Sequence, residues 1–139
     1  MNSEILQMID EYEEDKDFFG KASEEAIKKA EKRLGVTFPP QYREYVKNYG
    51  AGGICGVRIS GIEKEDYASV VEDTESYRDF GLPPKYIVIE DVDEFIYCLS
   101  TVEEYKVIRW DRTTKEEIKR YNTFDEYLQD MFQEAIDNW

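Results

Sequence analysis

The chain has no histidine and only two cysteines among its 139 residues. Without histidine, Ser-His-Asp and Cys-His catalytic sets cannot be assembled. Zinc sites that combine cysteine with histidine are excluded for the same reason. Cys55 and Cys98 lie too far apart in the sequence to form a paired-ligand motif, so each is expected to be a small buried hydrophobic side chain. We therefore expect no cofactor and no metal.

Long apolar runs are also missing. No stretch approaches the roughly 18 apolar residues that a membrane span requires. The start of the chain, Met1–Glu4, lacks the basic region of a secretory signal. These two absences predict a cytoplasmic protein that does not enter a membrane.

Positive charge is scarce. The chain has 18 Lys and Arg against 32 Asp and Glu, which gives a net charge of −14 at neutral pH. Phosphate backbones and anionic lipid headgroups repel such a chain, so nucleic-acid and membrane binding are disfavoured. Its natural partners are cationic surfaces.

Apolar residues are sufficient for a core. Leu, Ile, Val and Phe make up about a quarter of the chain, above the roughly one-fifth that indicates intrinsic disorder. The length suits one compact unit, and neither a linker nor an internal repeat interrupts it. We expect a single domain over residues 1–139.

Apolar spacing and capping residues predict five helices. They are expected over Ser3–Tyr12, Ser23–Gly35, Pro39–Gly50, Tyr67–Phe80 and Thr123–Ile136. The acidic stretch Asp10–Asp15 is expected to run from the first helix into solvent. Strands are predicted at Ile54–Ile59, Tyr86–Ile89, Phe95–Leu99 and Tyr105–Trp110, whereas Lys115–Tyr121 fits neither pattern clearly.

Helices followed by strands and a closing helix predict an α+β fold. The expected architecture is a single layer sandwich, in which helices pack on a largely antiparallel central sheet.

The connection between the second and third predicted strands carries four carboxylates, Glu90, Asp91, Asp93 and Glu94. Adjacent carboxylates repel one another unless solvent or a cation relieves them. The segment is either a solvated turn or a surface that faces a cationic partner. An EF-hand loop is excluded, because the central glycine and the distal glutamate are missing.

Three further patterns have two interpretations each. The glycine-rich run Gly50–Gly56 resembles a phosphate loop, but it follows a helix and feeds a strand, so a flexible turn is favoured. Asp93, Glu104 and Lys106 follow the order of a magnesium-dependent nuclease site, although such spacings arise by chance in a chain rich in charge. Trp110 is either core or an interface anchor.

The run from Ala30 to Tyr45, continuing to Gly52-Gly53, resembles the helix-turn-proline-helix signature of the SUKH superfamily. The segments Leu82–Ile89, Tyr97–Leu99 and Val107–Asp111 stand where that family has its central strands. Together, Tyr49–Gly53 and Glu90–Asp93 are most similar to its YobK-like bacterial branch. The family commonly has glycines where this chain has Glu90–Glu94.

The resemblance implies an α+β fold and a non-enzymatic immunity protein that neutralises a polymorphic toxin, often a nuclease. Since a nuclease gathers phosphates in a cationic cleft, an acidic inhibitor can attract and cover that cleft. The predicted partner-binding residues are Glu90, Asp91, Asp93, Glu94, Tyr97, Trp110 and Asp111. The alternatives are a metal-dependent nuclease-like enzyme and a regulatory scaffold without a toxin partner; the sequence leaves the oligomeric state open.

Overall fold

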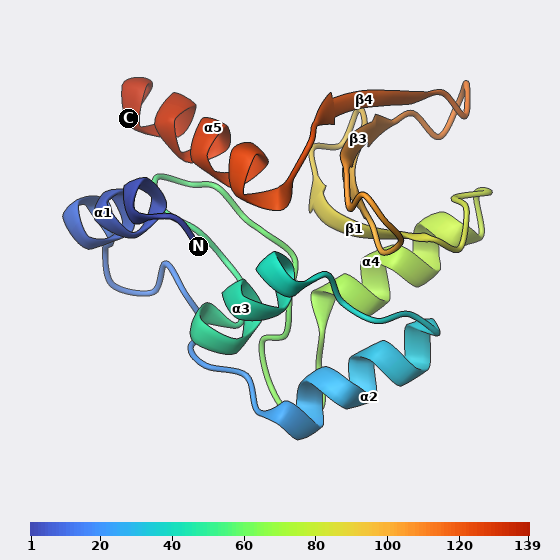
Figure 1. Ribbon diagram of the computed structural model, residues 1–139, viewed down its shortest axis with the longest axis horizontal. Helices are drawn as coiled ribbons and strands as arrows, with labels where there is room; N and C mark the ends of the chain where they lie inside the picture. The colour runs from blue at the N-terminus through green and yellow to red at the C-terminus, as the bar shows by residue number, and fades with distance from the viewer.

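The computed structural model describes residues 1–139 and has five helices and four strands (Figure 1). The helices are α1 (Ser3–Tyr12), α2 (Glu24–Leu34), α3 (Pro40–Tyr49), α4 (Ser69–Arg78) and α5 (Phe124–Asp137). The strands are β1 (Tyr86–Asp91), β2 (Ile96–Ser100), β3 (Val107–Trp110) and β4 (Glu117–Tyr121). No helix is both long enough and apolar enough to cross a membrane.

The four strands form one antiparallel sheet in the order β1-β2-β3-β4. Each strand pairs with its neighbour in the sequence, which short turns allow without a crossover. The predicted α+β fold with an antiparallel sheet is therefore confirmed, and the segment that fitted neither pattern supplies the edge strand β4.

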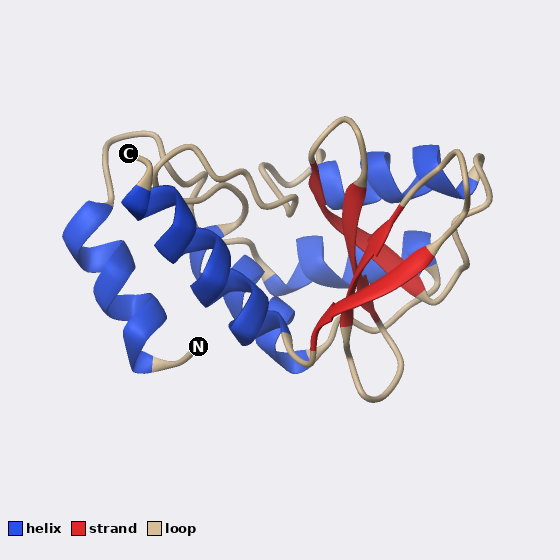
Figure 2. Cartoon of the chain, turned by 90° about the horizontal axis from the view of Figure 1, so that it is seen from above, coloured by secondary structure: helices blue, strands red, loops and turns tan.

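The sheet has apolar side chains on both faces. One face joins the main core of 25 buried residues, to which all five helices contribute. The other face forms a smaller cluster with Leu82, against which Tyr77 of α4 packs. Figure 2 shows the strongly twisted sheet at one end and α1 and α5 at the other. The continuous apolar runs of β1 and β2 are explained by burial on both faces.

The segment from Ile54 to Ile59 is a loop, so the predicted strand there is wrong. Cys55 and Gly56 have φ values of 52° and 84°, and neither value belongs to an extended strand. The loop also approaches the segment after α1 closely, because a Cβ on Gly52 would lie 2.1 Å from the carbonyl oxygen of Asp17. Glycine is required at that position.

The first helix begins differently from the prediction. Asn2, not Ser3, is the N-cap, and its Oδ1 accepts a hydrogen bond of 2.9 Å from the Ile5 N–H. The acidic stretch after α1 folds back over a turn, in which Asp17 Oδ2 accepts from the Glu14 N–H at 2.8 Å. An isolated bridge between Phe18 and Gly52 then fixes the chain to the glycine-rich loop.

Candidate partner-binding surface

Helices α1 and α5 lie side by side at the end of the molecule away from the β3–β4 turn (Figures 1 and 2). Helix α1 buries Ile5 and Ile9. Helix α5 begins at its predicted N-cap, Thr123, whose hydroxyl accepts from the Glu126 N–H at 3.1 Å. Gln129 joins the two helices, since it donates to Glu4 and its Oε1 accepts from the Asn2 amide at 2.9 Å. The pair is fixed by its buried stripes and by these polar contacts.

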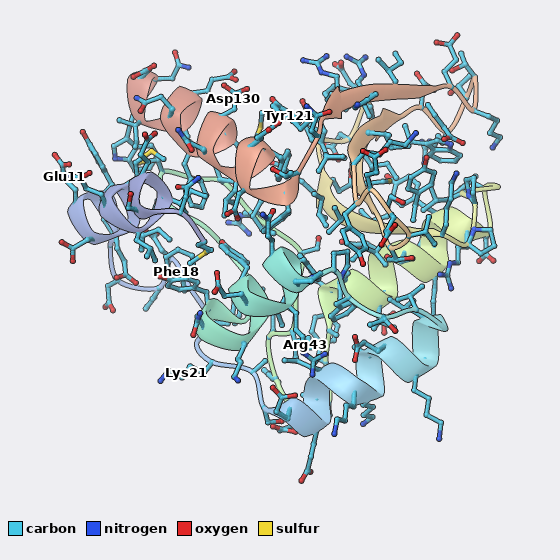
Figure 3. All side chains as sticks on the ribbon, viewed as in Figure 1. Glu11, Phe18, Lys21, Arg43, Tyr121 and Asp130 are labelled. Atoms are coloured by element: carbon cyan, nitrogen blue, oxygen red, sulfur yellow. The ribbon has the colours of Figure 1, made fainter.

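Most of the protein's excess negative charge lies on this helix pair and on the turn that follows α1. Residues 1–17 carry seven acids and one base, and residues 122–139 carry five acids and no base. Together they account for −11 of the net −14. Figure 3 labels Glu11 on α1 and Asp130 on α5. We call the exposed carboxylates of this region the acidic pole: Glu4, Asp10, Glu11, Glu13, Glu14, Asp15, Glu126, Asp130, Glu134 and Asp137.

A groove of about 300 Å³ runs between α1 and α5. Met8, Tyr12 and Ile136 supply its apolar part, and Glu4 and Glu11 are its acidic members. All three apolar side chains are only partly buried, although they pack against the main core. Apolar side chains surrounded by polar and charged groups are typical of protein interfaces. The acidic pole therefore contains a feature that a folded partner could fill.

The predicted hairpin surface is only partly available. Asp91, Asp93 and Glu94 are exposed, but Asp91 already accepts hydrogen bonds from the Tyr77 hydroxyl at 3.0 Å and the Asp93 N–H at 2.8 Å. Glu90 turns inward and accepts from the hydroxyl of Tyr127. Burial raises the pKa of Glu90, while the hydrogen bond from Tyr127 opposes that rise. Glu90 is thus a partly buried polar contact of the core, which corrects its assignment to the surface.

Trp110 is 1% exposed and lies in the smaller core cluster, with its ring 6.3 Å from that of Tyr77. It cannot meet a partner, so its interpretation as an interface anchor is wrong. Tyr97 is 8% exposed and packs between the rings of Phe95 and Tyr127. It too belongs mainly to the core, since its register on β2 directs it toward α5.

Asp111 occupies the turn after β3. Its carboxylate accepts from the N–H groups of Thr113 at 2.7 Å and Thr114 at 3.2 Å, and these bonds lower its pKa. A side chain that closes its own turn in this way has a structural role. Arg112 and Lys115 lie in the same turn, so this end of the sheet carries charges of both signs.

The arrangement expected of a metal-dependent nuclease is absent. Asp93 lies in the β1–β2 turn and Glu104 in the β2–β3 turn, at opposite ends of β2. The five residues of β2 separate them by roughly 17 Å. No group of three or more Asp, Glu or Cys side chains is placed to hold a metal ion. The metal-dependent alternative therefore loses its proposed site.

The glycine-rich loop borders a groove of about 480 Å³. Its charged lining residues are Lys16 and Arg58, with Asp17 and Glu63. This mixture of signs does not concentrate positive charge for a phosphate group, and the loop does not open a helix. The favoured interpretation, a turn that permits close backbone approach, agrees with the geometry of Gly52.

The SUKH_5 family, described as SMI1-KNR4 cell-wall, matches residues 3–133. The chain belongs to the SUKH superfamily. Membership confirms the resemblance and the fold expected from it, while the YobK-like branch stays a prediction. SUKH proteins are commonly immunity proteins, and the family implies a protein partner. In this SUKH chain, the α1–α5 pair is the strongest candidate for the surface that meets such a partner.

The acidic pole was not predicted as a site. Its signals were present in the sequence as the run Asp10–Asp15 and as a final helix without a single base. Neither signal indicates that the two helices, more than 100 residues apart, pack together. The hairpin stood out because its carboxylates are adjacent in the chain, whereas those of the acidic pole meet only in the folded SUKH domain.

Proposed function

We propose that this SUKH protein is an immunity protein that neutralises a cognate toxin, a nuclease, by covering its cationic active-site region with the acidic pole. The protein acts by binding and has no catalytic role of its own. The observation that carries the proposal is the gathering of −11 of the net −14 charge on α1, the turn that follows it and the C-terminal segment with α5. Family membership supports a protein as the partner.

Electrostatics favours a cationic nuclease over other partners. An enzyme that binds phosphates concentrates positive charge in its cleft, and a surface of opposite sign attracts it over long range. Complementary charge can raise association rates to about 10⁸–10⁹ M⁻¹s⁻¹ at low salt, as in the barnase–barstar case from which this figure is known. Association by the acidic pole is therefore expected to be fast and sensitive to salt.

Retention of the partner requires apolar contact as well as charge. The groove between α1 and α5 offers Met8, Tyr12 and Ile136, which are partly buried and flanked by Glu4 and Glu11. Anchors that fill such a groove exclude water around the ion pairs and slow dissociation. Mutations of the groove are thus expected to change the dissociation rate, and mutations of the exposed acids the association rate.

The decisive experiment mixes the purified protein with a candidate nuclease toxin. We expect stoichiometric loss of nuclease activity and a complex that weakens as salt is raised. The acidic pole variant Asp10→Asn, Glu11→Gln, Glu134→Gln should associate about tenfold more slowly, because three long-range attractions are removed. None of these three carboxylates makes an ion pair within the protein.

A matched control neutralises three exposed acids elsewhere, Glu25→Gln, Glu65→Gln and Asp66→Asn. It makes the same change in net charge and should associate nearly as fast as the unmodified protein. Persistent nuclease activity at excess protein would overturn the immunity role. Equal slowing by both variants would instead overturn the acidic pole as the binding surface. A pull-down that recovers a non-toxin partner would favour a regulatory scaffold.

A further inference from the structure

The two edges of the sheet are treated differently. Along β1, the Ser60 N–H donates to the Ile89 carbonyl at 2.8 Å, and the Val88 N–H donates to the Thr74 hydroxyl at 2.9 Å. Strand β4 pairs only with β3, and none of its backbone groups bonds to any segment outside the sheet. It forms the upper rim of the sheet in Figure 1. An open edge offers a row of unpaired N–H and C=O groups to another strand.

Unpaired cations surround this open edge. The segment 85–121 contains seven Lys and Arg residues, and none of them takes part in an ion pair. They are Lys85, Lys106, Arg109, Arg112, Lys115, Lys119 and Arg120. Every ion pair of the protein lies among α2, α3, α4 and the N-terminal amino group. Lys115 donates to the Phe80 carbonyl; the other six cations remain available to a partner in a chain with a large excess of carboxylates.

The cations lie on both faces of the sheet beside β4. On one face, Lys119 shares a groove of about 210 Å³ with Lys85 and Lys106. On the other face are Arg109, which is paired in register with Ile118, and Arg120, which is close enough to Tyr97 to lower its pKa. An added strand directs its side chains alternately to the two faces. Acidic side chains on either face of the added strand would therefore meet a cation.

The face with the two arginines also has an apolar component. Ile118 is 45% exposed, and the guanidinium of Arg109 lies 3.9 Å from the centre of the half-buried Phe95 ring. An arginine stacked on an aromatic ring keeps its edge N–H groups free for a carboxylate. The edge thus combines open backbone groups, cations and a small apolar surface.

We propose that β4 binds an extended acidic segment of a partner protein, which adds to the sheet as a fifth strand. Backbone hydrogen bonds to β4 would supply affinity, and carboxylates over Lys119, Arg109 and Arg120 would supply selectivity. This surface touches the acidic pole at Tyr121, whose hydroxyl donates a hydrogen bond to Asp130, but the inference does not depend on toxin neutralisation.

A second copy of the chain is a poor occupant of the same edge. Antiparallel pairing of two β4 strands about their centre places Lys119 opposite Lys119, and directly opposed like charges are destabilising. Charged residues on an edge strand commonly prevent such self-pairing. The same side chains attract a strand of opposite sign.

The acids nearest to the edge do not cancel this attraction. Glu117 accepts a hydrogen bond of 2.5 Å from the Tyr86 hydroxyl, and Glu103 and Glu104 border the groove of three lysines without pairing to them. Residues 85–121 have nine acids and seven bases, a net charge of only −2. Asp130 of α5 reaches the end of β4, where it accepts a hydrogen bond of 2.5 Å from the Tyr121 hydroxyl. Helix α1 lies at the opposite end of the molecule (Figure 1), and salt screens charge beyond about 8 Å at physiological ionic strength.

The test uses a capped peptide, Glu-Val-Glu-Glu-Val-Glu, which presents carboxylates to both faces when extended. We expect salt-sensitive binding, and a slowing of about fivefold or more in hydrogen exchange at the β4 amides that face away from β3. A peptide with Lys in place of Glu should not bind. A Glu peptide methylated on alternate backbone nitrogens should bind at least tenfold more weakly, because it cannot complete the hydrogen-bond ladder.

The variant Lys119→Glu, Arg120→Glu should lose at least tenfold in affinity for the Glu peptide, and Lys119→Gln, Arg120→Gln should lose less. The matched control Lys28→Glu, Lys29→Glu changes the net charge equally on α2 and should bind as before. No binding at millimolar peptide would overturn the proposal. Equal binding of the methylated peptide would overturn strand addition, because the peptide would then bind through charge alone. A dimer that protects the β4 amides without peptide would show that a second copy of the chain occupies this edge.

Discussion

The acidic pole and the β4 edge use charge in opposite ways. At the acidic pole, α1 and α5 gather carboxylates with almost no bases, and the helices hold together through their buried stripes. In residues 85–121, which contain the β4 edge, seven bases lie among nine acids without forming one ion pair. Net charge alone describes neither region, because one protein presents an anionic surface at one end and free cations at the other.

The helices between these regions show a third arrangement. Residues 18–84 contain ten bases and eleven acids, and their ion pairs include Arg33 with Glu75 and Arg43 with Glu24 and Glu31. Figure 3 shows Arg43 between α2 and α3. Exposed pairs of this kind contribute little stability, typically less than about 1 kcal/mol each. They do, however, occupy the charges that would otherwise be available to a partner.

The largest expected effect comes from comparing a buried tryptophan near the β4 edge with an exposed tryptophan near the acidic pole. Trp110→Ala, in the smaller cluster beneath the sheet, should lower the free energy of unfolding by about 3–5 kcal/mol, because it leaves a large cavity. Trp139→Ala removes a side chain that is 70% exposed and lies just beyond α5, so it should change the free energy of unfolding by less than about 0.5 kcal/mol. Urea denaturation followed by circular dichroism measures both. A small effect for Trp110 would show that this cluster adds little to stability.

The next prediction compares the acidic pole with the hairpin first expected to bind. Neutralising Asp91, Asp93 and Glu94 together should slow association with a cationic toxin several-fold, and less than the acidic pole variant does. Ile96 pairs with Trp110, so the hairpin lies at the same end of the sheet as the turn that carries Arg112 and Lys115, and these bases oppose its attraction for a cationic partner. Stopped-flow association at low salt decides between them. If the hairpin variant associated more slowly than the acidic pole variant, the hairpin would be the binding surface instead of the acidic pole.

A smaller effect concerns salt. Repulsion within the acidic pole should make the protein more stable by about 0.5–1 kcal/mol in 0.5 M sodium chloride than at low salt, because salt screens like charges. The variant Asp10→Asn, Glu11→Gln, Glu134→Gln should gain less from the same salt. Thermal unfolding at two salt concentrations gives the comparison. An equal gain for both proteins would place the repulsion elsewhere.

The smallest expected effect concerns Glu90, which lies between the sheet and α5. Burial raises the pKa of Glu90, so ionisation of this carboxyl opposes folding. Stability is therefore lost as pH rises from the unfolded pKa through the higher folded pKa. Glu90→Gln keeps a partner for Tyr127 and should be more stable than the unmodified protein at pH 7, with the difference shrinking below about pH 4.5. Chemical denaturation at pH 7 and pH 4 tests the sign, and a less stable variant at pH 7 would contradict it.

Local patterns predicted most of the helices and the sheet. Apolar stripes with caps at Ser23 and Thr123 located α2 and α5, and β1 to β3 were placed within a few residues. The strand expected at Ile54–Ile59 failed because Cys55 and Gly56 adopt left-handed backbone angles, in a loop that is held against Asp17 by the Gly53 N–H. Propensity describes an isolated segment and does not include such contacts.

The candidate site was harder to predict than the fold. Sequence adjacency drew attention to Glu90–Glu94, but the fold turned Glu90 toward Tyr127 and left the exposed acids among bases. Trp110 could have been core or surface, and only its position between the sheet and Tyr77 decided the matter. A surface made from two helices at opposite ends of the chain leaves no compact signature in the sequence.

The excess of carboxylates, the lack of histidine and the order of helices and strands follow from the residues themselves, since composition and periodicity are local properties. The meeting of α1 with α5, the exposure of one edge of the sheet and the closure of the other depend on the tertiary structure. These features arise from the burial of side chains that are distant in the sequence, and burial depends on which elements pack together.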